Sequence, residues 1–270
     1  MTSHVPIFDR KFSRAKVLRA EVLRTEVLAG LRRLLPRLDS VSRQTRALAF
    51  GIPALDRHLP QGGLGFGVLH EVTADSDEEI PAAFGFLMAL LGRMPQAGPL
   101  LLVVSRAALG DNVRPYGHGL HRLGLDPARL IVVETANDRQ ALWAIEESLR
   151  SNVPAAVAGA IATSLDLKTS QRLHLAAGES GIPLLLMKSA YAMEASVAVT
   201  RWRVAAAAAA RDRFGLVERW RWNVKLERCR NGRPGEWLVE FDHAYRFSLA
   251  AALAHPPVSL STGAQVRISG

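Results

Sequence analysis

Short apolar runs alternate with helical patterns through the middle of the chain, and this alternation restricts the fold more than any other feature. Six runs have the composition of buried strands, at 68–72, 99–105, 130–134, 155–161, 183–188 and 196–203. Helical patterns lie at 81–94, 116–123, 138–151 and 168–179. Buried strands separated by helices form a mostly parallel sheet that is covered on both faces, so the sequence predicts an α/β fold.

The character of the chain changes towards its C-terminus. The stretch "WRWNVKLERCRNGRPGEWLVEFD" alternates apolar and polar residues around Asn231–Gly235, which predicts a β-hairpin. The glycines of Gly62–Gly67 precede a strand instead of following one, so they are interpreted as turns and not as a dinucleotide-binding motif.

Three regions are predicted: an N-terminal basic segment over 1–46, a core domain over 47–250 and a flexible tail over 251–270. Within the first, residues 14–38 have the pattern of an amphipathic helix that ends near Pro36. Such a helix needs a surface to cover, either in its own core or on a partner. Its apolar stripe consists of Val17, Leu23, Val27, Leu28, Leu31, Leu34 and Leu35.

Charge is distributed unevenly over the 270 residues, whose formal net charge is +9. Residues 1–50 and 201–235 each carry a net charge of +7, whereas residues 51–200 carry −4. Basic flanks of this kind usually meet nucleic acid or an acidic partner. The alternative is a general preference for arginine, because the chain has 29 arginines and only five lysines.

The single cysteine, Cys229, excludes an internal disulfide and any cysteine-based zinc motif. No apolar run approaches the roughly 20 residues of a membrane span, and no secretory signal is recognised at the N-terminus. We therefore expect a reduced, cytoplasmic protein without a membrane partner.

The turn "EVTADSDEEIP" stands where a strand leads into a helix, the position of a phosphate loop in many nucleotide-binding proteins. A phosphate loop needs glycines and a lysine, but no Gly-Lys pair occurs in the chain, and acids crowd this turn. The same acids would stabilise the N-terminus of the following helix. We interpret the turn as a degenerate phosphate loop, formed by Ala74, Asp75, Asp77, Glu78, Glu79, Ile80 and Pro81.

Other catalytic patterns are equally absent from the sequence. The run 155–161 is followed by Ala162, and the first acid beyond it is Asp166, so no carboxylate ends that strand to hold Mg²⁺. His118 and His121, near Asp126, are interpreted as part of a connector and not as metal ligands. Glu146 and Glu147 are interpreted as a solvated helix face. We predict a protein that is not an enzyme and has no catalytic residue, metal or cofactor.

Arginine and tryptophan gather between residues 200 and 235, where they could stack on bases and bind phosphate. Two alternatives are an edge hairpin, whose tryptophans cover the core and whose arginines are solvated, and a surface for a protein partner. The candidate contacts for nucleic acid or a partner are Arg201, Trp202, Arg203, Arg211, Arg213, Arg219, Trp220 and Arg221.

The stretches "PALDRHLPQGGL", "SVAVTRWRVAA" and "LERCRNGRPGEW" resemble the ImuA family of RecA-like proteins in bacterial SOS mutagenesis. The resemblance covers roughly residues 47–247. It implies a RecA-like sheet in which the Walker A glycine, lysine and hydroxyl fall on Glu79, Ile80 and Pro81. The segments that correspond to the DNA-binding loops of RecA are short here, at Ala162–Ser170 and Ser189–Ala195.

The family implies a non-catalytic adaptor in translesion DNA synthesis. Its implied partners are an ImuB-like protein related to inactive Y-family polymerases, an error-prone replicative-type polymerase α subunit, and RecA. The 14–38 helix is then expected to dock on a partner. Two other functions stay open on the sequence: sequence-independent DNA binding through the arginines, and cell-division inhibition of the type performed by SulA.

Overall fold

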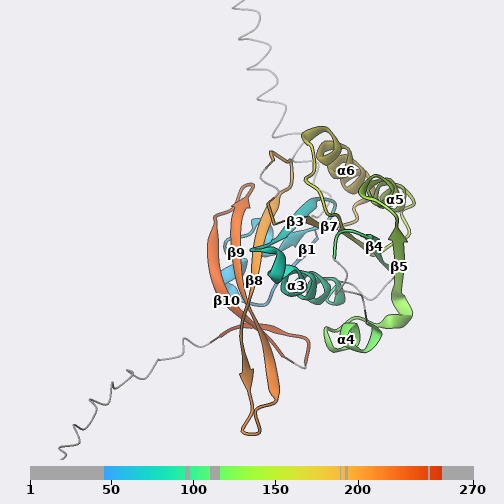
Figure 1. The fold of residues 1–270 in the computed structure, drawn as a ribbon. Helices are drawn as coiled ribbons and strands as arrows, with labels where there is room; N and C mark the ends of the chain where they lie inside the picture. The colour runs from blue at the N-terminus through green and yellow to red at the C-terminus, as the bar shows by residue number, and fades with distance from the viewer. Residues whose placement is uncertain are drawn as a thin grey trace, which may run out of the picture. The chain divides into compact units, whose positions relative to one another are not determined.

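The computed structural model describes residues 46–94, 98–109, 116–188, 190–191, 194–242 and 244–250. The predicted helix over 14–38 and the predicted tail over 251–270 lie outside the described residues. Residues 46–250 build one large sheet with helices on both of its faces (Figure 1). The predicted α/β fold class, with a mostly parallel sheet and a C-terminal hairpin, is confirmed.

The sheet has nine strands in the order β11-β10-β9-β8-β3-β7-β6-β4-β5. The six from β8 to β5 run parallel to one another, and β9, β10 and β11 continue the sheet in antiparallel fashion. The strands are β3 (Leu69–Ala74), β4 (Leu100–Ser105), β5 (Leu130–Thr135), β6 (Ala156–Ala160), β7 (Leu184–Lys188), β8 (Thr200–Arg211), β9 (Val217–Cys229), β10 (Gly235–Phe241) and β11 (Phe247–Leu249).

The helices form a layer on each face of the sheet. One face packs against α3 (Ile80–Gly92), the most apolar helix. The opposite face packs against α5 (Asp138–Arg150) and α6 (Leu167–Ser180), which lie side by side (Figure 1). Two short helices complete the fold: α2 (Pro53–Asp56) precedes β3, and α4 (Gly117–Arg122) lies between β4 and β5.

Each face of the sheet has its own hydrophobic core. On the α3 side, Phe50, Phe86, Trp202, Trp222 and Phe247 pack together as a group of aromatic rings. The core on the α5 and α6 side is aliphatic. It is built mainly from Leu69, Val103, Ile145, Leu149, Leu173, Leu184 and Leu186.

Helix boundaries agree with the sequence patterns to within two residues, and side-chain caps mark the starts of α5 and α6. The side chain of Asn137 accepts a hydrogen bond from the Gln140 amide at 3.0 Å and begins α5. Asp166 does the same for α6, at 2.6 Å from the Thr169 amide. Gly181, with φ of 72°, ends α6 in the left-handed conformation that favours glycine.

The prediction for the strand over 196–203 is wrong in its limits, since β8 starts at Thr200 and continues to Arg211. Its second half is a run of alanines, which carries no periodic signal of a strand. The extended conformation of this run is stabilised by backbone pairing with β9 and not by side-chain packing. An irregularity in the register lies between Ala207 and Ala210. The turn beyond is closed by Asp212, whose carboxylate accepts hydrogen bonds from the amides of Phe214 and Leu216.

The predicted hairpin around Asn231–Gly235 is confirmed by the antiparallel pairing of Gly235 with Leu226. It does not form the edge of the sheet, because β11 pairs with the outer side of β10. The glycine-rich stretch forms turns and one short strand, β2 (Leu64–Gly65), which pairs with β1 (Ala47–Leu48).

Glu146 was expected on a solvated helix face, and this is wrong. Its side chain is buried, and its two oxygens accept from Arg150 of α5, at 2.7 Å, and from Arg172 of α6. The acid therefore joins the two helices. Glu147 is half exposed, in agreement with its expected solvation.

His70 is fully buried within β3 and completes a chain of hydrogen bonds. Trp202 Nε1 donates to Thr200 Oγ1 at 2.8 Å, and that hydroxyl lies 2.8 Å from His70 Nδ1. His70 Nε2 lies 2.9 Å from the carbonyl oxygen of Gly65 and so donates to it. Burial favours the neutral ring, and it lowers the pKa of His70 from 6.5 to about 4.

We expect His70 to make folding pH-dependent. The unfolded chain binds a proton near pH 6.5 and the folded chain only near pH 4, so stability is retained above pH 6.5 and lost as the pH falls between these values. The loss should reach about 3 kcal/mol. Urea unfolding from pH 7.5 to 4 of the parent and of His70→Gln measures it. Parallel pH curves for the two proteins would contradict the prediction.

Candidate functional site

The turn between β3 and α3 lies at the carboxyl end of a central parallel strand, where α/β proteins commonly bind ligands. Ala74 ends β3 in a buried position, and Asp77–Glu79 form a single 3-10 turn before Ile80 starts α3. Asp75, Asp77 and Glu78 are exposed. The strand-turn-helix arrangement predicted for the degenerate phosphate loop is therefore present, with acids on its surface.

Two hydrogen bonds fasten this turn to β8. Glu79 Oε2 accepts from the amide of Ala206 at 2.6 Å, and the amide of Asp75 donates to the carbonyl of Val204 at 3.1 Å. The Ile80 side chain packs against the core on the α3 side. The side chains of the turn thus provide carboxylates and an apolar contact, but no positive charge that would balance a phosphate.

The end of β6 has carboxylates nearby, but they hold backbone groups. The amides of Ala162 and Thr163 donate to Asp138 at 3.1 and 2.8 Å. Partial burial opposes ionisation of Asp138, yet hydrogen bonds from hydroxyl and amide groups outweigh it and lower its pKa. Asp166, the first acid after the strand, caps α6.

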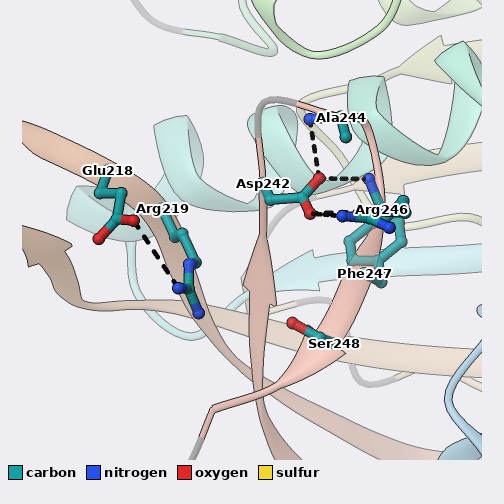
Figure 2. Close-up of a pocket in the computed structure, with 7 residues that line it drawn as sticks. All are labelled: Glu218, Arg219, Asp242, Ala244, Arg246, Phe247 and Ser248. Carbon is teal, nitrogen blue, oxygen red and sulfur yellow. Dashed lines mark hydrogen bonds and ion pairs between the residues drawn. The ribbon is translucent and has the colours of Figure 1, made fainter.

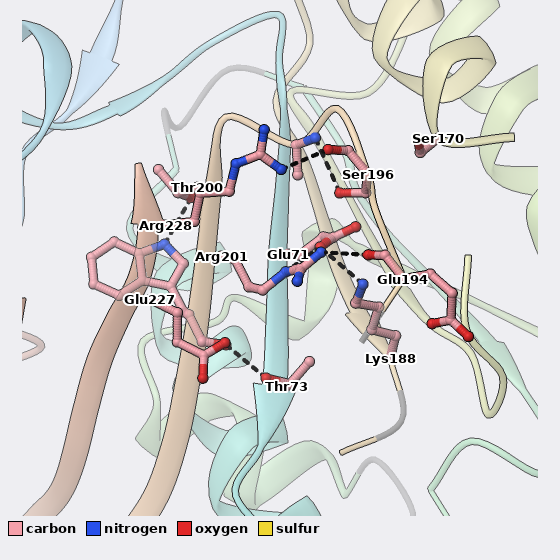
Figure 3. Close-up of polar contacts among 12 residues, drawn as sticks. Glu71, Thr73, Ser170, Lys188, Glu194, Ser196, Thr200, Arg201, Glu227 and Arg228 are labelled. Atoms are coloured by element: carbon pink, nitrogen blue, oxygen red, sulfur yellow. Dashed lines mark hydrogen bonds and ion pairs between the residues drawn. The ribbon is translucent and has the colours of Figure 1, made fainter. Parts of the chain in front are cut away.

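Most of the candidate arginines are engaged in ion pairs across neighbouring strands. Arg203 Nε lies 2.5 Å from Glu227 Oε1. Arg201 contacts Glu71, and Figure 3 shows these two side chains. Arg219 and Arg221 both reach the buried carboxylate of Glu240. Arg201, Arg203 and Arg221 are therefore not solvated as that alternative expected, whereas Arg219 is exposed. Ion pairs within the sheet compensate the charges of all four.

The tryptophans of this region divide between the core and the surface. Trp202 is 0% exposed and Trp222 is 5% exposed, so neither ring is available to stack on a base in this structure. Trp220 is 40% exposed. The remaining candidates lie near the tip of the β8–β9 hairpin, where Arg211 donates to the Gly215 carbonyl and the Arg213 guanidinium lies 4.6 Å from the centre of the Phe214 ring.

A groove lies next to the turn, between α3, α4 and the β8–β9 hairpin. Its volume is about 710 Å³, and most of its lining is apolar. Pro81 and Ala82 line one end of the groove, at the first turn of α3 and directly after the acidic turn. The other main lining residues are Phe84, Gly85, Tyr116, Leu120, Arg122, Ala206, Ala207, Ala209, Arg211, Trp220, Arg221 and Trp222.

A second pocket, of about 610 Å³, lies where β9, β10 and β11 meet (Figure 2). Its charged groups are paired with one another: Arg246 lies 3.0 Å from Asp242, and Arg219 reaches Glu218 and Glu240. These contacts satisfy the charged groups of the second pocket internally, so the groove beside α3 is the candidate site of recognition.

Two relatives match most of the chain. They are named "Protein ImuA" and come from the NA1000/CB15N and ATCC 19089/CB 15 strains of Caulobacter vibrioides. Each is 36% identical over 236 residues, which cover 80% of this chain and 93% of the relative. The chain belongs to the ImuA family. No protein-family profile matches it.

In this ImuA-family chain, the sequence interpretation missed a buried polar cluster. Lys188 Nζ lies 3.0 Å and Arg201 Nε 3.1 Å from the same oxygen of Glu71, while the other oxygen, Oε1, has no hydrogen-bond partner among the described residues (Figure 3). The side chains of Glu71 and Lys188 are both 0% exposed. Their separation in sequence hid the pair, since β3 and β7 meet only in the folded sheet.

No group of three or more histidine, cysteine or acidic side chains among the described residues could hold a metal ion. His118 and His121 both lie exposed on α4. The search for a helix that is long and apolar enough to cross a membrane, made over the same part of the chain, found none.

Proposed function

We propose that this ImuA-family chain is a non-catalytic adaptor in bacterial SOS-induced translesion DNA synthesis. Membership of the family supports a role in the ImuA/ImuB mutagenesis system. Within that system, the chain would bridge an ImuB-like protein, related to an inactive Y-family polymerase, and an error-prone replicative-type polymerase, with RecA as a further contact.

The acidic turn after β3 is the observation that carries the non-catalytic part of the proposal. Asp75, Asp77 and Glu78 are exposed there, and Glu79 is committed to the amide of Ala206. Each close contact between a carboxylate and a phosphate charge costs on the order of 1 kcal/mol even in water. A triphosphate would meet several of them, without a lysine to offset the repulsion.

Isothermal calorimetry tests this part. With the full-length protein, we expect no heat of binding for ATP or ADP with Mg²⁺ at micromolar concentrations. A micromolar Kd for either nucleotide would overturn the non-catalytic proposal.

The adaptor part is tested by co-purification with the ImuB-like protein and with the error-prone polymerase, each expressed alone. We expect at least one to bind the full chain directly. Substitution of Leu28 and Leu31 by glutamate, within the predicted 14–38 helix, tests whether that helix contributes to docking. If neither protein is retained by the parent chain, the adaptor proposal fails.

Sequence-independent DNA binding is a second candidate, supported by the exposed Arg213, Phe214 and Trp220 near the tip of the β8–β9 hairpin. It requires an affinity for single-stranded DNA that falls steeply with salt, because phosphate contacts release counterions. The absence of binding in low salt would remove it.

A further inference from the structure

We infer that the groove between α3, α4 and the β8–β9 hairpin is the docking site for a partner protein's apolar peptide segment that carries acidic residues. The inference rests on the proposed function only in that the chain acts through protein partners. Its test does not involve nucleotide, so it can fail while the non-catalytic proposal stands.

The wall of the groove is built to admit a backbone closely. Gly85 of α3 and the alanines at 206, 207 and 209 of β8 present almost no side chain. Glu79 fixes this wall, because its carboxylate holds the amide of Ala206 next to the first turn of α3. Small residues beside the large rings of Phe84 and Trp222 leave room for apolar side chains of an incoming segment.

Two aromatic side chains line the groove and are left open to solvent. Tyr116 is 69% exposed at the start of α4, and Trp220 is 40% exposed on β9. Exposed tryptophan and tyrosine at a concave apolar surface are the residue types that dominate binding energy at protein interfaces. They come from distant parts of the chain, so only the folded protein presents them together.

The charge of the lining is positive. Of its three arginines, Arg221 is neutralised by Glu240. Among the described residues, Arg211 donates only to the carbonyl of Gly215, and Arg122 has no ion pair or hydrogen bond. No acid is part of the lining. A segment with acidic side chains next to its apolar anchors would complement this surface.

The two terminal segments that lie outside the described residues do not have the acidic charge that would complement this lining. Residues 1–45 hold ten lysines and arginines against four acids, and residues 251–270 hold one arginine and no acid. A nucleic-acid strand is also less suitable. Its phosphates need a continuous basic track, whereas this lining is mainly apolar with two uncompensated arginines. The complementary occupant is an acidic segment of another protein.

The test starts from a displayed library of random 16-residue peptides that is selected on the full-length protein. The best peptide is then synthesised with a fluorophore, and its Kd is measured by anisotropy. We expect enriched sequences that combine apolar residues with two or more acids. Trp220→Ala should weaken binding more than about tenfold, because it removes an interface aromatic.

Charge reversal provides the sharper result. The double variant R122E/R211E should bind the selected peptide at least about tenfold more weakly, and should prefer a version in which lysines replace its acids. The matched control is R106E/R139E, which makes the same charge change at two exposed arginines outside the groove. It should bind as the parent does. Thermal unfolding of all variants establishes that each is folded, and Arg122→Gln with Arg211→Gln replaces the reversal if it is not.

Several outcomes would overturn the inference. They are the absence of an enriched peptide, enriched peptides without acids, or equal binding to the parent, to Trp220→Ala and to R122E/R211E. Competition by a 30-residue oligo-dT, lost in the same groove variants, would assign the surface to nucleic acid instead.

Discussion

Replacement of Trp202 by alanine is expected to lower the free energy of unfolding by about 3–5 kcal/mol. Trp202 is fully buried, and its ring centre lies 5.4 Å from that of Phe50 and 6.4 Å from that of Phe86. The truncation opens a cavity among these rings and also leaves the Thr200 hydroxyl without its indole donor. Urea unfolding followed by circular dichroism measures the change.

The matched control is Trp143→Ala, since Trp143 is 65% exposed on α5. We expect that substitution to change stability by no more than about 0.5 kcal/mol. A loss of less than about 1 kcal/mol in Trp202→Ala would show that this ring does not belong to the core. Trp202 would then again be a candidate residue for stacking on a base.

The second large effect is expected at the buried pair of Glu71 and Lys188. Glu71→Leu should cost about 3–5 kcal/mol, because it leaves the Lys188 ammonium in the core without its carboxylate. The double variant E71L/K188M should recover part of this loss, since two apolar side chains replace Glu71 and Lys188. Recovery is incomplete because Arg201 still loses its contact with Glu71 and keeps only its hydrogen bond to the Glu194 carbonyl among the described residues. Glu147→Leu, at the half-exposed ion pair with Arg150, is the control and should cost less than about 1 kcal/mol.

The pH dependence of Glu71→Leu gives a second signature. Burial already lowers the pKa of Lys188, and the neighbouring Glu71 partly offsets that effect. Without the Glu71 carboxylate, the pKa of Lys188 in the folded protein falls further below its value in the unfolded chain. At a pH between these two values, Lys188 binds its proton more completely in the unfolded chain than in the folded protein. The stability of Glu71→Leu should therefore rise as the pH increases from 7 towards 10, more than that of the parent. A flat difference between the two proteins would contradict a charged Lys188 in the core.

The sequence predicted the sheet well because its strands are apolar on both faces and two of its helices, α5 and α6, carry side-chain caps. The runs at 99–105 and 183–188 could hardly be anything but buried strands, and Asn137 and Asp166 mark helix starts that are visible in the sequence. The limits of β8 were predicted wrongly for the opposite reason, because its second half is a run of alanines. Alanine favours neither a periodic strand pattern nor a fixed face, so its conformation is decided by pairing with β9.

The candidate site was predictable only in part. The acidic turn could be located from the order of strand, turn and helix. The engagement of Glu79 with Ala206 could not, because the partners are 127 residues apart. Likewise, alternation indicates that Trp202 and Arg203 point to opposite faces of β8. It does not indicate which of the two faces is buried. The groove joins α3, α4 and the β8–β9 hairpin, so it exists only in the tertiary structure.

The position of β3 in the sheet has a consequence for synthesis on the ribosome. This strand is made early, yet one neighbour is β7 and the other is β8, whose Thr200 pairs with a residue of β3 that precedes it by 130 positions. Translation adds roughly 5–20 residues per second, so β3 lacks its complete set of neighbouring strands for on the order of ten seconds. Nascent chains of this protein should therefore depend on chaperones until β8 has emerged, when the central strand becomes enclosed.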